Sequence, residues 1–503
     1  MTYTAIVAAI AAMGIIFGTV GILAKKKGFQ SIPEYFLASR SVRAPLVISL
    51  LISGSFSLNG MLYQIYLGYK IGAWSLLTQF AWALSFVFLA NFGPRIAQSA
   101  GMHNFIGSVF STTTRKLAAL CSIIGLGLQI GWEYNVAKSA FGGLASPALP
   151  DLTITLMTLL VFAIGTFYTL VGGMRSNSWT DLFENLLKIG CFVFLLMLII
   201  GVLETPALSH KDWANAIFPP PSAAIAELTF SGLVANLVFS LAWQFVDMTT
   251  WQTAIVTQSK DDPGATSRSL YWAGFAVFLA PGVLGTFLGL GLVGQSGLDS
   301  NSVLPALIRT VGGGVPIVVL MTVAISATVM SFIDGMLLGI GYTFITDLLF
   351  SETVDRLGLL RIPDEKTARD LSYQQVVGGI MSWTRVALIA AAIAMSFGLG
   401  WFSDKWHIGL FDMVYLVIVG QLSIFGPSLV GLLDRRPYPF VGPFAILVPL
   451  VIGYGLAIYG TIYKLGDLVN WASVIALSFS FGIAFFGSRR ADKSDLRSAV
   501  AGG

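Results

Sequence analysis

The chain has 503 residues, of which 55% are hydrophobic and only 11% are charged, and its mean hydropathy is +0.80. Soluble domains carry roughly 25% charged residues, so this composition excludes an ordinary soluble protein and predicts a polytopic protein embedded in a lipid bilayer. The net charge of +4 does not indicate a nucleic-acid partner, because the basic residues lie between apolar runs and are explained by membrane topology.

A helix needs about 20 apolar residues to cross a bilayer. The sequence therefore predicts an all-α membrane protein with about thirteen spans and one polytopic domain over residues 1–503. The expected spans lie at 3–24, 45–69, 72–94, 116–142, 152–171, 181–203, 228–256, 270–296, 313–349, 376–401, 409–433, 440–463 and 468–487.

The distribution of basic residues predicts the orientation. The first span has no Lys or Arg before it and is followed by Lys25-Lys26-Lys27, which is the opposite of a signal peptide and places the N-terminus outside. The C-terminal tail then lies in the cytoplasm, and we expect a plasma (cytoplasmic) membrane location. Only five basic residues fall in outside loops: Lys70, Lys211, Arg309, Lys405 and Lys464.

The second span is a poor continuous helix. Its segment Ser53–Gly60 reads Ser-Gly-Ser-Phe-Ser-Leu-Asn-Gly, and glycines with small polar residues at membrane depth favour an interruption. Backbone carbonyls freed by such a break could bind a hard cation, which prefers oxygen ligands. The alternative is a face of small residues that only packs against another helix.

Polar residues in the second and fourth spans are candidates for solute contact. Glu133 lies in the span 116–142 together with Gln129, and a charge this close to a span is expected to face a cavity or a partner on another helix. We group Glu133 and Gln129 with Tyr63 and Gln64 as substrate or gate candidates. An ionised Glu133 in the site would suit a solute with an amine or amide. The alternative is a side chain that snorkels to the outer surface.

Residues 168–181 read Tyr-Thr-Leu-Val-Gly-Gly-Met-Arg-Ser-Asn-Ser-Trp-Thr-Asp. The glycine pair at 172–173 predicts a tight turn, and Asp181 is expected where a cytoplasmic loop enters the next span. This segment resembles the Tyr-Thr-x-x-Gly-Gly-x-x-x-x-x-x-Thr-Asp signature of the sodium/solute symporter family, which includes sodium-coupled sugar, proline and sialic acid carriers. The resemblance extends from Phe36 to about Leu433.

The resemblance implies a LeuT-like core of two five-helix halves with inverted topology, which meet at a site near the membrane midplane. On this numbering the leading helix and its loop occupy 1–44, the halves occupy 45–203 and 228–433, and two trailing helices occupy 440–487. The first helix of each half is expected to be interrupted, so the span 228–256 mirrors 45–69. Gln244 and Asp247 in that span are further substrate or gate candidates, and the alternative for Asp247 is a polar residue near the cytoplasmic helix end.

The resemblance also implies a sodium site. It assigns the carbonyls of Ser55 and Leu58 in the broken span, the carbonyl of Thr328 and the hydroxyl of Ser331 as ligands. The chain departs from the family at Phe332, where a second hydroxyl is usual, and a phenyl ring supplies no oxygen ligand.

Two acids complicate the expected sodium site. Asp334 follows Ser331 by three residues and shares its helix face, and Asp181 matches an acid that holds a second sodium in some family members. We expect Asp181, Ser331 and Asp334 to form the coupling-ion site. Two carboxylates around one cavity could instead share a proton. The structural alternatives are that Asp181 caps a helix start and that Asp334 faces a cytoplasmic cavity with a structural partner.

These features predict a secondary active symporter that uses a sodium gradient to take up a small organic solute by alternating access. A proton-coupled symporter of the same fold is the alternative favoured by Phe332, and a transporter-like solute sensor is disfavoured by the short tail after about Phe486. No P-loop or nucleophile–base pair is evident, so an enzyme is not expected. Cys121 and Cys191 fall inside spans, the three histidines lack metal-ligand spacing, and neither a cofactor nor a metal other than sodium is expected.

Overall fold

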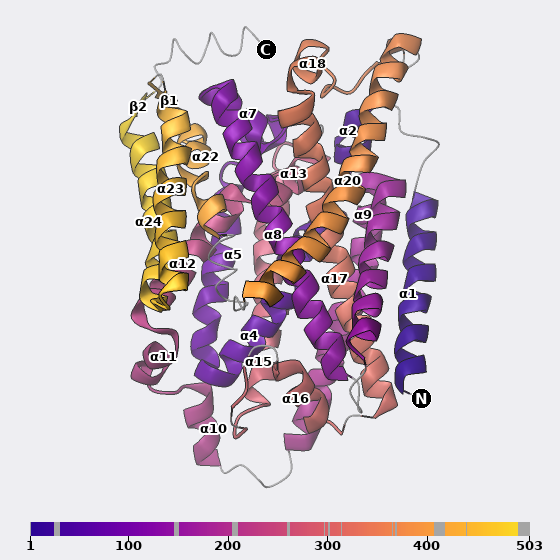
Figure 1. The fold of residues 1–503 in the computed structure, drawn as a ribbon, viewed down its shortest axis with the longest axis vertical. Helices are drawn as coiled ribbons and strands as arrows, with labels where there is room; N and C mark the ends of the chain where they lie inside the picture. Colours follow the sequence, from indigo (N-terminus) through magenta and orange to yellow (C-terminus); the bar gives the residue numbers. More distant parts are fainter. Residues whose placement is uncertain are drawn as a thin grey trace.

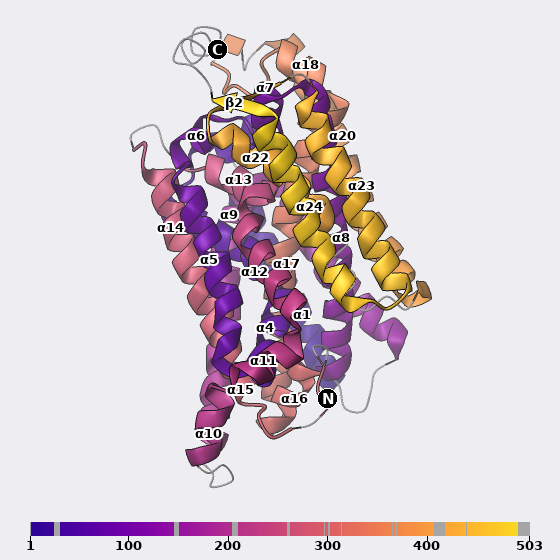
Figure 2. The same ribbon diagram turned by 90° about the vertical axis from the view of Figure 1, so that its left-hand side faces the viewer.

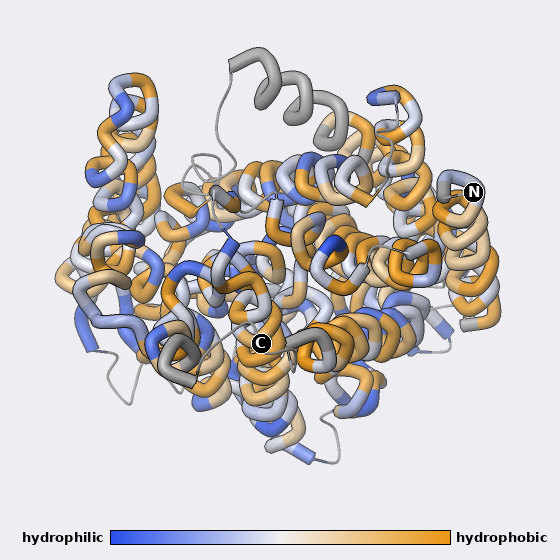
Figure 3. The backbone as a smooth tube through the Cα atoms, turned by 90° about the horizontal axis from the view of Figure 1, so that it is seen from below, coloured by the Kyte–Doolittle hydropathy of each residue, from blue (hydrophilic) through white to orange (hydrophobic). Residues whose placement is uncertain are grey.

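The computed structural model describes residues 2–24, 31–144, 150–203, 210–258, 262–295, 297–299, 302–312, 314–364, 366–367, 370–406, 418–438 and 440–490. Most of the described residues form helices that run along one long axis (Figure 1). Apolar residues dominate the helices when the molecule is seen end-on (Figure 3). Large exposed apolar side chains, such as Leu186 and Met197, cover the outer faces, as expected for helices that contact lipid.

The elements follow the chain in this order. The first group is α1 (Thr2–Ala24), α2 (Ile32–Leu37), η1 (Ala38–Arg40), α3 (Ala44–Ser55), α4 (Leu58–Ile71), η2 (Gly72–Ser75), α5 (Leu76–Ala90), α6 (Gly93–Gln98), α7 (Met102–Val109), α8 (Thr112–Leu144) and α9 (Asp151–Leu203). The second group is α10 (His210–Ile217), α11 (Pro221–Leu228), α12 (Phe230–Val246), α13 (Met248–Ile255), α14 (Ala265–Val277), η3 (Phe278–Leu284), α15 (Gly285–Leu290) and α16 (Val303–Thr310). The third group is α17 (Val315–Thr343), η4 (Phe344–Leu349), α18 (Ser351–Arg356), α20 (Leu371–Trp406), α22 (Phe425–Leu432), β1 (Arg435–Pro437), α23 (Val441–Ile462), α24 (Gly466–Phe486) and β2 (Ser488–Arg490).

Each predicted span falls on one helix or on two or three consecutive helices, except for residues 296, 313 and 409–417, which lie outside the described residues. By length and composition, eight continuous helical segments of the described chain can cross a membrane, or nine if the bent pair α11–α12 is one span. This count is below thirteen because α9 covers two predicted spans and Leu58–Ala90 runs from α4 through α5. It also leaves out α20 and the shorter apolar helices Ala44–Ser55 and Ile418–Leu432. The pair α23–α24 packs on one flank of the bundle (Figure 2).

Both interrupted spans are confirmed. The helix α3 ends at Ser55 and α4 begins at Leu58, with non-helical torsion angles at Phe56 (φ −105°, ψ 68°). The helices α12 and α13 are separated at Asp247 (φ −82°, ψ 104°). The pair α3–α4 runs from the upper to the lower end of the bundle in Figure 1, while α12–α13 runs the opposite way. Both breaks lie inside the bundle.

The expected loop before Asp181 is wrong. Residues 151–203 are helical apart from a kink at Gly173 (φ +55°, ψ −154°), so Asp181 lies more than two turns inside the resumed helix and does not cap its start. Only 1% of the Asp181 residue surface is exposed. The glycine pair does change the direction of the chain as predicted, but the change occurs at Gly173 alone and no loop follows it. The side chain of Tyr35 packs against this kink and donates a hydrogen bond to the Thr169 carbonyl at 3.0 Å.

The Gly173→Ala substitution tests the kink in α9. A Cβ at Gly173 would lie 2.5 Å from the Tyr35 carbonyl oxygen, and the backbone conformation there (φ +55°, ψ −154°) lies next to a region that essentially only glycine adopts and that costs other residues about 1–3 kcal/mol. We expect the variant to have a lower melting temperature in detergent. Gly190→Ala is the matched control in the same helix, because a Cβ there meets nothing within 4 Å and alanine favours helix. Equal melting temperatures for the two variants would contradict a strained kink.

Candidate functional site

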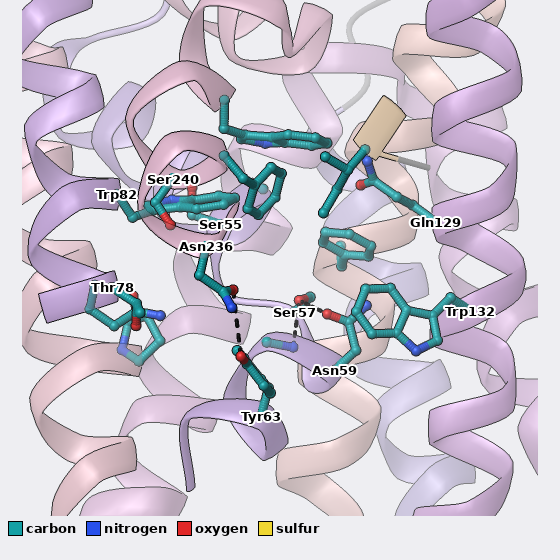
Figure 4. Close-up of a pocket in the computed structure, with 18 of the residues that line it drawn as sticks. Ser55, Ser57, Asn59, Tyr63, Thr78, Trp82, Gln129, Trp132, Asn236 and Ser240 are labelled. Carbon is teal, nitrogen blue, oxygen red and sulfur yellow. Dashed lines mark hydrogen bonds between the residues drawn. The ribbon is translucent and has the colours of Figure 1, made fainter. Parts of the chain in front are cut away.

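A cavity of about 150 Å³ lies beside the break between α3 and α4 (Figure 4). Its walls come from α3, α4, α5, α8, α12 and α17. Drug-sized ligand pockets span about 300–1,000 Å³, so this volume suits a smaller molecule. The predicted candidates Ser55, Tyr63 and Gln129 all line the cavity, as does Phe332.

The cavity wall is aromatic and polar without charge. Its aromatic members are Tyr63, Trp82, Trp132, Phe239, Trp243 and Phe332, and its amides are Asn59, Gln79, Gln129 and Asn236. Trp82 stacks on Trp243 with ring centroids 5.8 Å apart, and Phe239 meets Trp243 edge-on at 4.9 Å. Among the lining residues none is ionisable at neutral pH. The cavity can therefore hold a flat ring between aromatic faces and pair its polar edge with amides.

Glu133 does not line this cavity. Its two carboxylate oxygens accept hydrogen bonds from the backbone amides of Leu58 and Asn59, at 2.7 Å and 3.1 Å. Those amides open α4 and have no intrahelical partner, so the carboxylate satisfies two orphan donors and complements the positive end of the helix dipole. Glu133 is completely buried and does not snorkel to the surface. Glu133, which we predicted to contact solute, therefore binds backbone amides of α4 in this structure.

The other candidates on the two broken spans are also engaged internally. Gln64 donates hydrogen bonds to Thr286 Oγ1 at 2.8 Å and to the Ser75 carbonyl at 3.3 Å, away from the cavity wall. Asp247 caps α13 by accepting from the amides of Thr249 and Thr250, each at 3.1 Å. The Gln244 side-chain oxygen accepts a 2.6 Å bond from the Thr250 hydroxyl. Asp247 is buried inside the bundle, at the break itself.

A second, smaller cavity of about 20 Å³ lies behind Phe332. Asp181 and Ser331 line it, and both Gly54 and Phe332 line it together with the first cavity. Room for one water-sized particle needs about 10–15 Å³, so this space is large enough for a small ion. The phenyl ring of Phe332 therefore stands between the two cavities. The structure brings Asp181 and Ser331 together as the sequence predicted.

Three carboxyl groups meet at this depth of the bundle. Asp181, Glu184 and Asp334 each place one carboxylate oxygen within 4.8 Å of the others, and all three are at most 1% exposed. Glu184 Oε1 accepts a hydrogen bond from the Tyr168 hydroxyl at 3.1 Å. No described residue donates an ordinary hydrogen bond to Asp181 Oδ1 or Glu184 Oε2. Buried carboxyl groups with free oxygens need a cation or a proton.

Lys188 and Glu184 are charged residues of this cluster that were not predicted from the sequence. Its ammonium donates hydrogen bonds to Ser331 Oγ at 2.8 Å and to the Phe56 carbonyl at 3.3 Å. The side chain is fully buried. The signal was the spacing Asp181, Glu184, Lys188, which places three ionisable groups on one helix face inside an apolar span.

The sodium-ligand role of the Ser55, Leu58 and Thr328 carbonyls stays a prediction, and the contacts of this region are as follows. The Thr328 carbonyl accepts a 3.2 Å bond from the Ser331 hydroxyl. The carbonyl at the break that points to this position belongs to Phe56, which lies between the predicted Ser55 and Leu58. Ser55 lines the solute-sized cavity, and the Leu58 amide binds Glu133.

No family model and no curated protein sequence matches the chain. Among solved structures, a Na⁺-coupled sialic acid symporter in a substrate-bound, outward-open state is similar with a TM-score of 0.71 at 16% identity, over 98% of this chain and 99% of that one. Mhp1, a nucleobase-cation-symport-1 family transporter, is similar in a closed conformation with bromovinylhydantoin bound (TM-score 0.56, 13% identity, 92% and 96% covered). Its inward-facing conformation gives a TM-score of 0.54 at 12% identity, over 95% and 98%. These likenesses show the fold, and the expected LeuT-like fold class is confirmed.

Proposed function

We propose that the chain is a secondary active symporter that couples the sodium gradient to uptake of a small organic solute by alternating access. The observation that carries the proposal is the cluster Asp181, Glu184 and Asp334, where three buried carboxyl groups face one buried ammonium. Such an excess of negative charge is costly in a bilayer unless a cation enters or the carboxyl groups take up protons. The cluster adjoins a broken helix that also lines the larger cavity.

The shared fold supports a transport role. The similar solved proteins are a Na⁺-coupled sialic acid symporter and a nucleobase-cation-symport-1 family transporter. In folds of this kind, interrupted helices expose backbone groups to ions and solute near the membrane midplane. A cation at the acid cluster would stabilise one arrangement of α9 and α17 relative to the break in α3–α4. Gly54 and Phe332 line both the larger cavity and the smaller one.

The cavity also indicates the class of solute. Its aromatic walls and amide groups suit a small molecule with a flat ring and hydrogen-bonding edges. Because no ionisable side chain lines it, a solute of no net charge fits better than a carboxylate or an ammonium compound. Glu133 does not supply a counter-charge, since both its oxygens bind backbone amides. We therefore take the transported solute to be a neutral, ring-containing molecule.

Sodium coupling is tested by melting the purified protein in detergent with sodium, lithium, potassium or choline at matched ionic strength. A ligand at a hundred times its dissociation constant stabilises the native state by about 2.7 kcal/mol. We expect saturable, sodium-selective stabilisation of the wild type and its loss in Asp181→Asn. Asp151→Asn in the first turn of α9, where Asp151 is exposed and pairs with Lys138, is the control that keeps the response.

The outcomes separate the two coupling ions. Sodium coupling would be contradicted if sodium did not change the melting temperature. Proton coupling would be supported if, in addition, the melting temperature depended on pH in the wild type and not in Asp334→Asn. With sodium coupling established, neutral ring-containing solutes are screened by a change in intrinsic tryptophan fluorescence, to which Trp82, Trp132 and Trp243 of the cavity contribute. Preferential binding of charged solutes would contradict the proposed solute class.

The orientation follows from charge. In Figure 1, α1 begins at the lower end, where α16 carries Arg309, while α18 with Arg356 lies at the upper end. The greater number of basic residues at the upper end would place it in the cytoplasm. We expect a membrane-impermeant maleimide to label Arg309→Cys in intact cells and Arg356→Cys only after permeabilisation. Both sites are exposed, both native cysteines are buried, and the reverse labelling pattern would contradict the orientation.

A further inference from the structure

The buried ammonium of Lys188 lies where a cation ligand set was expected. It is held between the Ser331 hydroxyl of α17 and the Phe56 carbonyl freed by the break in α3–α4. It also stands 4.9 Å from the centre of the Phe56 ring. A hydroxyl and a freed carbonyl are oxygen ligands of the kind that a sodium ion would use here. The ammonium therefore binds the oxygen atoms of Phe56 and Ser331, close to where the sequence predicted a sodium ion.

The charges around Lys188 also favour a cation at this position. The ammonium interacts electrostatically with four carboxyl groups from α9, α17 and α8, namely those of Asp181, Glu184, Asp334 and Glu133. A second monovalent cation between Phe56 and Ser331 would meet the ammonium at contact distance, and like charges this close repel strongly in a buried site. Asp181 Oδ1 and Glu184 Oε2 have no hydrogen-bond donor among the described residues and remain available to a cation.

Phe332 fits the same arrangement. A bare sodium ion needs oxygen atoms around it, whereas a lysine ammonium is satisfied by up to three hydrogen bonds. The position next to Ser331 carries a phenyl ring that offers no oxygen. The Phe56 carbonyl and the Ser331 hydroxyl satisfy two of the three donors of the ammonium, which needs no further oxygen from position 332.

We propose that Lys188 is a tethered cation that permanently fills the position between the Phe56 carbonyl and the Ser331 hydroxyl. The cluster of Asp181, Glu184 and Asp334 is then the position left for a free coupling cation, so one sodium accompanies each transport cycle. This inference rests on the proposed function, because it assigns the number of ions that the symporter carries. It gives Lys188 a positioning role at the helix break in place of an exchangeable ion.

The test compares sodium-dependent melting in a set of variants of the full chain. Lys188→Ala opens an ion-sized space between the two oxygens, and we expect it to gain a second saturable, sodium-selective stabilisation. Adding Ser331→Ala to Lys188→Ala should remove that gain. Lys188→Met is the matched control, because its apolar side chain fills much of the space and provides no site. A Lys188→Ala protein with an unchanged sodium response would overturn the proposal.

A second measurement covers the case in which Lys188→Ala does not fold. Equilibrium binding of radioactive sodium to the wild type should saturate at one ion per chain, because Lys188 leaves only the carboxyl cluster for a free ion. Two sodium ions bound per chain would overturn the assignment. A wild type without any sodium response, beside a Lys188→Ala variant that has gained one, would contradict sodium coupling and leave the role of Lys188 standing.

Discussion

The bilayer core offers no water to broken backbone or buried charge, and this constraint governs how the molecule is built around its two interrupted helices. Each break is closed by an ionisable side chain. Glu133 accepts from the first amides of α4, Asp247 accepts from those of α13, and Lys188 donates to the carbonyl of Phe56. The breaks are therefore stable at membrane depth without solvent, and the charges that close them bring the surrounding helices into fixed positions.

The two cavities depend on the same break. Gly54 and Phe332 line both, so a change in the angle between α3 and α4 alters the solute space and the ion space together. Coupling needs a bistable element whose equilibrium both ligands bias. The short connection Phe56–Ser57 joins α3 and α4, and the Phe56 carbonyl accepts a hydrogen bond from Lys188 of α9, so we propose it as that element.

The sequence was sufficient for those features that depend on local composition. The small polar residues of Ser53–Gly60 predicted the first break, and apolar run lengths predicted the helices. Tyr63 and Gln129 line the cavity, and their contact with a solute stays a prediction. Asp181 was misplaced because a glycine pair normally ends a helix, whereas Gly173 here turns it within one residue.

The contacts of Glu133 and Lys188 could not be derived from the sequence, since both pair with backbone atoms of a helix distant along the chain. The spacing of Lys188 and Glu184 from Asp181 was nevertheless a visible signal of a charged helix face.

Equilibrium binding of radioactive sodium to the purified wild type, counted per protein molecule, tests directly whether one free cation binds beside one tethered cation. We predict one sodium per chain at saturation; two would contradict the role of Lys188, and none would contradict sodium coupling.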